Sequence, residues 1–269
     1  MPQTQTSTPV PRQGAPPAGV TFARGQARVA DFIDHTLLKA EASRGDIATL
    51  CAEAREHRFA AVCVNPVWVP LCRELLSGSG VRLATVVGFP LGASEAESKA
   101  AETALAVRRG AEEIDMVAAI GHVKSGDWAH VAADIAAVVR AAEGRLVKVI
   151  IESAALTPVE IIRACETARD AGAGYVKTST GFHPAGGATA EAVALMRLTV
   201  GDALGVKASG GIRDCESALR MLAAGATRIG TSSGVAMARC SGPGPLPLAE
   251  LLAGRAAPPP AGASGASSY

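Results

Sequence analysis

The stretch TPVEIIRACETARDAGAGYVKTST, residues 157–180, joins a helical pattern to a strand-like one. Thr157 and Glu160 have the spacing of a capping box, which predicts a helix that begins here. Gly172 is the residue type that commonly ends a helix. Residues 174–180 then form a short β-branched run, which favours a buried strand. A helix that leads directly into such a strand is typical of α/β proteins with a parallel sheet.

The same unit recurs on both sides of this stretch. We expect eight strands, at 29–34, 60–65, 83–89, 113–119, 146–152, 174–180, 205–211 and 227–233. We expect helices between them, near 43–57, 67–77, 94–109, 127–142, 157–171, 189–200 and 214–224; capping-box spacing also recurs at Ser94 and Glu97. Eight such units predict a (β/α)₈ TIM barrel. The alternative is a doubly wound sheet, which would usually carry a Gly-x-Gly-x-x-Gly turn after its first strand, and none follows residue 34.

The barrel is predicted to be a single domain over residues 28–240. Residues 1–27 are rich in Pro, Gln, Thr and Gly, and we expect a disordered N-terminal tail there. Residues 241–269 are rich in Pro, Ala, Gly and Ser, and we expect a flexible C-terminal tail that ends in Tyr269.

Composition narrows the range of functions. The chain has 269 residues, 48% of them hydrophobic, and a formal net charge of +1, so no strong field favours nucleic acid or an anionic membrane. No apolar stretch reaches membrane-spanning length, and the N-terminus lacks the apolar segment of a signal peptide. The six cysteines form no CxxC pair. We therefore expect a cytoplasmic protein with reduced thiols that binds neither nucleic acid nor membrane.

Three lysines fall on three consecutive predicted strands, where a barrel places its active site: Lys148, Lys177 and Lys207. Crowded, buried ammonium groups repel one another and are poorly solvated, and both effects lower the pKa of a lysine. A lysine with a lowered pKa can attack a carbonyl and form a Schiff base. The pattern does not decide which lysine reacts. It also leaves open that all three only form ion pairs with Asp115 and Glu152.

The loops after the last three strands are rich in Gly, Ser and Thr. They read STGFHPAGGAT (179–189), ASGGIRD (208–214) and GTSSG (230–234). Backbone amides exposed by glycine, together with hydroxyl groups, are suited to bind a phosphate, and this region is a frequent phosphate site in TIM barrels. The pattern contains no metal cluster and no dinucleotide motif, so we predict no metal and no cofactor.

Eight motifs occur in the order found in one known family: DHTLLK (34–39), VCVNP (62–66), VVGFPLG (86–92), EIDMV (113–117), VKVIIE (147–152), YVKTSTGF (175–182), VKASGGIR (206–213) and RIGTSSG (228–234). Together they resemble the deoxyribose-phosphate aldolase family over nearly all of residues 29–240. The resemblance implies a (β/α)₈ class I aldolase without a metal. Such an enzyme interconverts 2-deoxy-D-ribose 5-phosphate with acetaldehyde and D-glyceraldehyde 3-phosphate, in deoxyribonucleoside breakdown.

The resemblance also implies roles for individual residues. Lys177 falls on the Schiff-base lysine, Lys207 on the lysine that keeps it deprotonated, and Asp115 on the proton-relay carboxylate. Substrate-binding positions fall on Asp34, Thr36, Lys148, Gly181, Gly210, Gly211, Ser232 and Ser233. One branch of the family has a phosphate-binding lysine where this chain has Phe182. Some members end in a tyrosine that assists proton transfer, a role that Tyr269 would take.

Two other functions remain open from the sequence. One is a non-catalytic barrel that binds a sugar phosphate, which would not need the lysine pair. The other is a Schiff-base aldolase with a different acceptor aldehyde. In each case the expected partners are small sugar phosphates and aldehydes, and family members commonly assemble as homodimers or homotetramers.

Overall fold

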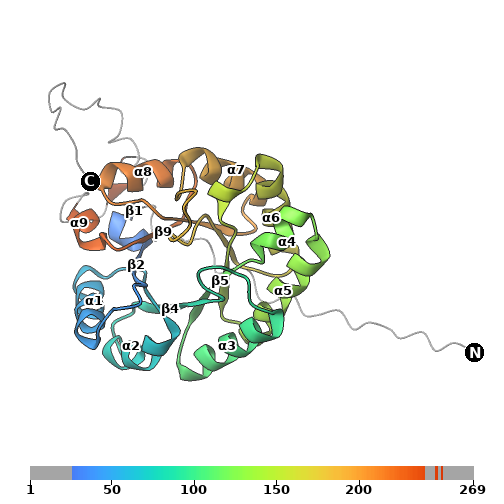
Figure 1. The fold of residues 1–269 in the computed structure, drawn as a ribbon. Coiled ribbons are helices and arrows are strands. Elements are labelled where there is room, and N and C mark those ends of the chain that lie inside the picture. The colour runs from blue at the N-terminus through green and yellow to red at the C-terminus, as the bar shows by residue number, and fades with distance from the viewer. Residues whose placement is uncertain (1–25, 240–245, 248–249, 251–269) are drawn as a thin grey trace, which may run out of the picture.

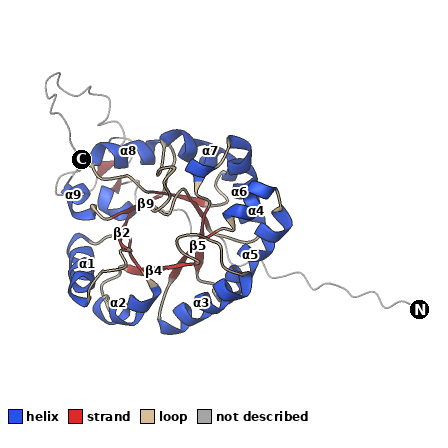
Figure 2. Ribbon diagram, viewed as in Figure 1, coloured by secondary structure: helices blue, strands red, loops and turns tan. Residues whose placement is uncertain are grey.

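The computed structural model describes residues 26–239, 246–247 and 250. Eight parallel strands close into a barrel in chain order, from β2 round to β9 (Figure 2). They are β2 (Ile33–Leu37), β3 (Ala61–Val64), β4 (Arg82–Val87), β5 (Glu113–Val117), β6 (Leu146–Ile150), β7 (Tyr175–Lys177), β8 (Gly205–Ser209) and β9 (Arg228–Thr231). The predicted TIM barrel is confirmed, and the doubly wound alternative is excluded because β9 pairs with β2.

Helices surround the strands as an outer ring (Figure 1). They are α1 (Arg44–His57), α2 (Val69–Leu75), α3 (Ala96–Arg109), α4 (Ile120–Ser125), α5 (Trp128–Ala141), α6 (Pro158–Asp170), α7 (Ala190–Val200), α8 (Cys215–Ala223) and α9 (Gly234–Ala238). The capping box of Thr157 and Glu160 is confirmed at α6. The prediction that α3 starts with Ser94 and Glu97 is wrong, because Glu95 precedes the helix and makes no side-chain cap. The short helices α4 and α9 were not expected.

The first barrel strand begins later than the sequence pattern suggests. Residues 29–32, predicted as strand, form a 3₁₀ turn, and β2 runs from residue 33 to residue 37. The turn is held by Asp31, whose carboxylate accepts hydrogen bonds from the backbone and the guanidinium of Arg28. A local side-chain hydrogen bond of this kind competes with strand pairing. The shift places Asp34 inside the barrel, level with Gly230 of β9.

Four residues that were predicted to belong to the tails form a small two-stranded sheet instead. Strand β1 (Gln26–Ala27) pairs antiparallel with β10 (Leu246–Pro247), which ties the two ends of the described chain together. Ala27 is fully buried in the core, and this burial explains why the segment is not a free tail.

The thiols differ from the expected fully reduced set in one place. Among the residues that the structure describes, four cysteines are free and buried (Cys51, Cys63, Cys72 and Cys165), whereas Cys215 is disulfide-bonded. Within the described part of the chain, none of the helices combines the length and the apolar character needed to cross a membrane.

The main apolar core lies between the barrel and the helices, which leaves the barrel interior to another set of side chains. Part of that interior is lined by a small apolar cluster from β3, β4 and the residue after β2, with Phe89 packed against it: Leu38, Cys63, Ala84 and Val86. The remaining strands supply charged side chains, and these form the candidate site.

Candidate active site

Charged side chains from six strands, β2 and β5 to β9, converge inside the barrel. Strand β5 contributes two acids, Glu113 and Asp115, because residues two apart on a strand share a face. The backbone register sets Asp115 beside Lys148 of β6 and sets Lys177 of β7 beside Lys207 of β8. All of these side chains are buried. The structure therefore brings together the three lysines that the sequence analysis singled out.

Lys177 has the fewest carboxylate contacts of the three lysines. Its ammonium nitrogen lies 2.9 Å from Asp115 Oδ2, and its side chain is 3% exposed where those of the other two are fully buried. Burial lowers the pKa of Lys177, and the positive charge of Lys207 lowers it further, against the opposing effect of Asp115. Lys177 is therefore the lysine best able to present a neutral amine.

Lys148 and Lys207 are held as cations. Lys207 Nζ lies 2.5 Å from Asp34 Oδ2 and 2.7 Å from Asp115 Oδ2. Lys148 Nζ lies 2.7 Å from both Glu113 Oε2 and Asp115 Oδ1. Burial opposes their charge, but these carboxylates outweigh it and raise the pKa of both lysines. The expected mutual lowering of all three pKa values is thus found for Lys177 alone.

Asp115 is the centre of the network. Its Oδ2 accepts hydrogen bonds from both Lys177 and Lys207, and its Oδ1 accepts one from Lys148. Burial would raise the pKa of Asp115, yet the three ammonium groups hold it well below its ordinary value. Asp115 is therefore a carboxylate at neutral pH, and one of its oxygen atoms links Lys177 to Lys207.

Two members of the network were not predicted as site residues. Arg228, the first residue of β9, donates to Asp34 Oδ1 and to Glu113 Oε2, each at 2.6 Å. Strand alternation could have found Glu113, because it shares a face with Asp115. Arg228 gave no such signal, because the active site of a barrel is expected at the carboxyl ends of its strands and Arg228 is the first residue of β9. The alternative left open from the sequence, in which the lysines pair with Glu152 as well as Asp115, is not seen for Glu152. Glu152 instead accepts hydrogen bonds from the backbone and the hydroxyl of Thr180.

The charges of the network balance only if one lysine is neutral. Four cationic side chains (Lys148, Lys177, Lys207 and Arg228) face three acids (Asp34, Glu113 and Asp115), an excess of one positive charge in a buried site. Uncompensated buried charge is costly, so the group with the lowest affinity for its proton loses it first. That group is Lys177, as its lowered pKa indicates.

The loops that follow β7 and β8 are joined to each other. The Thr178 hydroxyl donates to the Ser209 carbonyl, the Ser209 amide donates back to that hydroxyl, and the Ser209 hydroxyl donates to the Ser179 carbonyl. Just beyond, Gly181 and Gly210 have positive φ values of 83° and 86°. A Cβ atom on Gly210 would lie 3.5 Å from the Gly181 Cα, so these two predicted phosphate-binding residues are neighbours.

The remaining predicted site residues lie at the same end of the barrel. Gly211 and Ser232 are exposed in the loops after β8 and β9, and Ser233 is half-buried at the start of α9. The Thr36 hydroxyl, on β2, donates to the carbonyl oxygen of Asp34. Tyr269 lies outside the described residues.

Phe182, which stands where some aldolases have a lysine, belongs to an aromatic pair. Its ring is 53% exposed and meets the Phe89 ring edge-on, with 5.2 Å between centroids. The two residues follow β7 and β4, so their contact joins two loops that are separated by β5 and β6 in the barrel. The opening of the barrel beside these two loops is therefore lined by aromatic rings rather than by a cationic side chain.

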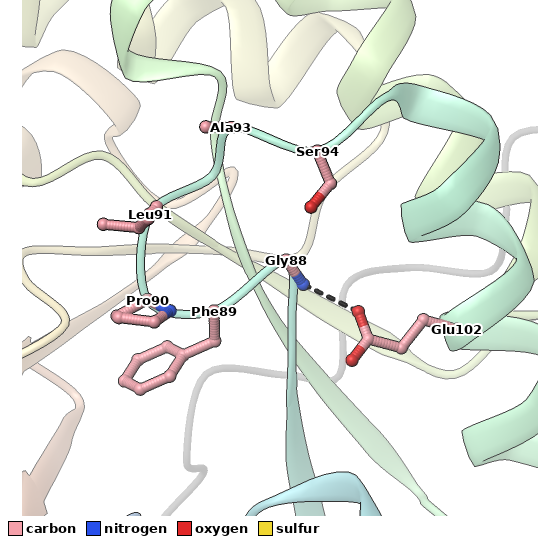
Figure 3. Close-up of a pocket in the computed structure, with 7 residues that line it drawn as sticks. All are labelled: Gly88, Phe89, Pro90, Leu91, Ala93, Ser94 and Glu102. Carbon is pink, nitrogen blue, oxygen red and sulfur yellow. Dashed lines mark hydrogen bonds between the residues drawn. The ribbon is translucent and has the colours of Figure 1, made fainter.

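Phe89 also lines a cavity of about 300 Å³ in the loop between β4 and α3 (Figure 3). The Gly88 amide donates a hydrogen bond to Glu102 Oε2 at 2.8 Å beside this cavity. Leu91, which also lines the cavity, is 75% exposed to solvent. Its lining contains none of the lysines, so the geometry of the charged cluster, rather than this cavity, identifies the candidate site.

A buried ion pair lies behind the same loop. Lys99 of α3 donates to Asp134 of α5 at 2.7 Å and to the Val117 carbonyl, at the end of β5, at 3.0 Å. A Cβ atom on Gly88 would lie 2.9 Å from Lys99 Cε, so the lysine stem supports the loop after β4. Lys99 thus connects the ends of β4 and β5, and β5 carries Asp115.

Comparisons with known proteins agree with this geometry. A deoxyribose-phosphate aldolase of Brevibacillus brevis is 59% identical over 206 residues, which cover 77% of this chain and 93% of that protein. The deoxyribose-phosphate aldolase of Lysinibacillus sphaericus is 60% identical over 209 residues, with 77% of this chain and 93% of that protein covered.

Solved structures give the same result. The aldolase QR15 superimposes with a TM-score of 0.75 at 40% identity, over 78% of this chain and 94% of that one. The deoxyribose phosphate aldolase of Aeropyrum pernix, described as a tetramer, superimposes with a TM-score of 0.73 at 35% identity, over 78% of this chain and 89% of that one. The model of the DeoC/LacD family aldolases matches residues 28–240. With its barrel, its lysine cluster and these relatives, the chain belongs to the DeoC/LacD family of aldolases.

Proposed function

We propose that this chain is a deoxyribose-phosphate aldolase. It reversibly cleaves 2-deoxy-D-ribose 5-phosphate to acetaldehyde and D-glyceraldehyde 3-phosphate, in deoxyribonucleoside breakdown. The relatives with 52–60% identity are named for this activity, which supports the substrate. The observation that carries the mechanism is the contrast within the lysine cluster, where the pKa of Lys177 is lowered while those of Lys148 and Lys207 are raised.

The first half of the reaction uses Lys177 as a nucleophile. Its neutral amine adds to C1 of the open-chain sugar, and loss of water leaves a protonated imine at that carbon. Lys207 favours this step because its positive charge, on the other side of Asp115 Oδ2, keeps the proton off Lys177. The imine then serves as the sink for the electron pair that cleavage releases.

Cleavage requires loss of the proton from the C3 hydroxyl. Asp115, acting through water, accepts this proton and holds it beside the ammonium of Lys207 until the enamine carbon is protonated. The C2–C3 bond breaks, its electron pair forms an enamine on Lys177, and glyceraldehyde 3-phosphate leaves. Protonation of the enamine carbon and addition of water release acetaldehyde and restore the amine. We assign assistance in that protonation to Tyr269.

The phosphate is proposed to bind where the loops after β7, β8 and β9 meet. Gly181 and Gly210 bring two backbones close together there, so their amides can approach one anion. Gly211, Ser232 and Ser233 complete the proposed phosphate site. Because Phe182 supplies no charge, backbone amides and hydroxyl groups carry the interaction. Asp34, Thr36 and Lys148 are proposed to line the sugar end of the site.

Borohydride trapping tests the mechanism. The protein is incubated with deoxyribose 5-phosphate, reduced, digested and analysed by mass spectrometry, while acetaldehyde release is followed in an unreduced sample. We expect the reduced adduct on the peptide that contains Lys177. We expect Lys177→Met to lose both adduct and turnover, and Lys124→Met, which removes an exposed lysine, to keep both.

Each other outcome of this experiment has a definite meaning. An adduct on Lys148 or Lys207 would keep the imine mechanism and overturn the choice of lysine. Binding of the sugar phosphate without any adduct would favour a non-catalytic barrel. Trapping with other acceptor aldehydes, but no cleavage of deoxyribose 5-phosphate, would favour a different Schiff-base aldolase.

We also propose a cytoplasmic homo-oligomer of two or four chains. The Aeropyrum pernix neighbour, described as a tetramer, supports an oligomer. Light scattering of the purified full-length chain tests the proposal, and a monomer mass at micromolar concentration would contradict it.

A further inference from the structure

Two histidines and an aspartate meet on the outer ring of helices, away from the lysine cluster. His122 is in α4, His130 is in the first turn of α5, and Asp127 lies between the two helices. One possible ligand atom from each residue lies within 4.8 Å of the corresponding atoms of the other two. All three side chains are reachable from solvent, because His122 and His130 are half-buried and Asp127 is exposed.

A tight turn fixes this arrangement. Gly126 ends α4 with a φ of 71°, a left-handed conformation that glycine adopts without strain. The Asp127 amide then donates to the His122 carbonyl at 3.0 Å, so the chain returns directly over the end of α4. The three residues are held by the backbone itself, on two helices whose positions the barrel determines.

The side chains of His122, Asp127 and His130 also contact one another. Asp127 Oδ1 caps α5 by accepting the His130 amide at 3.2 Å, and Asp127 Oδ2 lies 3.1 Å from His122 Nδ1. The two imidazole rings stack in parallel, with 3.5 Å between centroids and 8° between planes. Stacking keeps both rings beside one carboxylate, and because the in-plane lone pairs of parallel rings do not converge, one of the solvent-reachable rings must rotate for both to bind the same cation.

We propose that His122, Asp127 and His130 form a binding site for a divalent transition-metal ion. Two imidazole nitrogens and one carboxylate oxygen suit Zn²⁺, Ni²⁺ or Cu²⁺, whereas Ca²⁺ and Mg²⁺ prefer oxygen ligands. Three protein ligands leave the remaining positions to water. A cation there links α4, which follows β5, to α5, and it stabilises the helical layer outside Asp115 rather than taking part in the reaction.

The sequence pattern did not reveal this site. The histidines are eight positions apart, a spacing that matches no known metal motif, and they lie in two different helices. Only the turn at Gly126, together with the unexpected helix α4, brings them together.

Zinc titration of the untagged, EDTA-treated full-length protein tests the proposal by calorimetry at neutral pH. We expect one Zn²⁺ per chain and little response to Mg²⁺. His122→Ala and His130→Ala should each weaken Zn²⁺ binding by about tenfold or more, the effect expected when metal coordination is disturbed. His57→Ala, which removes another half-buried histidine near a helix end, should bind Zn²⁺ like the parent protein.

Trp128 provides a second readout that does not depend on activity. It begins α5 between Asp127 and His130, whereas Trp68, the other tryptophan, lies in the turn before α2. Bound Cu²⁺ should quench the fluorescence of Trp128, so quenching should persist in Trp68→Phe and be lost in Trp128→Phe and in His130→Ala.

Two results would overturn the proposal. One is a Zn²⁺ dissociation constant above about 1 mM, which corresponds to weak association. The other is uptake of Zn²⁺ that survives in the double variant His122→Ala/His130→Ala, because the cation would then bind elsewhere. Circular dichroism of each variant confirms that its barrel has folded.

Discussion

Replacing Lys207 by Met should move the pH dependence of this enzyme toward higher pH. The replacement removes one positive charge and keeps a side chain of similar length in the barrel. Asp34 keeps Arg228 as a partner, and Asp115 keeps Lys148 and Lys177, so no acid is left unpaired. What Lys177 loses is the repulsion that, after burial, is the next contribution lowering its pKa.

The structure bounds the size of this effect. Both nitrogens contact Asp115 Oδ2, at 2.7 Å for Lys207 and 2.9 Å for Lys177, so they are no more than about 5.6 Å apart, the sum of the two distances. Two unit charges at this separation repel by about 3 kcal/mol at an effective dielectric constant of about 20. Relief of that repulsion lowers the neutral fraction of Lys177 by roughly a hundredfold on the acid side of its titration.

The assay is the pH profile of kcat/KM for cleavage of deoxyribose 5-phosphate. In the proposed mechanism only the neutral amine of Lys177 reacts, so activity should rise as pH increases through its pKa. In Lys207→Met this pKa is higher, so the rise should shift to higher pH, with the greatest loss at low pH and partial recovery in alkali. Lys207→Arg, which keeps the charge, should keep the parent profile. A uniform loss at every pH would refute the electrostatic role and leave Lys207 as a proton donor only.

Two further perturbations test other parts of the structure. Lys99→Met should lower the free energy of unfolding by about 3–5 kcal/mol, because it strands the buried carboxylate of Asp134 without its cation. Urea denaturation measures this loss; the double variant Lys99→Met/Asp134→Leu should recover much of it, and an equally unstable double variant would contradict the reasoning. Deletion of Tyr269 should slow exchange of the acetaldehyde methyl protons in heavy water, measured by NMR, while trapping at Lys177 persists. An unchanged exchange rate would remove Tyr269 from the proton path.

The alternation of short β-branched runs with helical patterns was enough to predict the barrel. Each run is buried by its neighbours, and each parallel connection requires a helix, so local pattern and topology agree. The prediction failed where local hydrogen bonds compete with pairing. Hydrogen bonds from Arg28 to Asp31 hold residues 29–32 in a 3₁₀ turn, and the hydrophobic periodicity of the sequence does not reveal such hydrogen bonds.

The candidate site was only partly predictable, because its chemistry depends on distances around a closed ring. Strand position identified three lysines but treated them as equivalent, and only the resemblance to a family selected Lys177. The structure separates them by the number of carboxylates that each contacts. Arg228 was missed because it is the first residue of β9, whereas the active site of a barrel is expected at the carboxyl ends of its strands.

The excess of one positive charge at the barrel centre sets stability against activity in the evolution of this enzyme. Lys148, Lys207 and Arg228 each contact at least two acids, so after loss of any of them the charges balance only if Lys177 holds its proton. The positive charge of Lys177 is the one that is not needed to balance the three acids. Substitutions that stabilise the fold are therefore easiest to find at Lys177, to which the proposed mechanism gives the nucleophilic role, so selection for activity would have to hold this position against selection for stability.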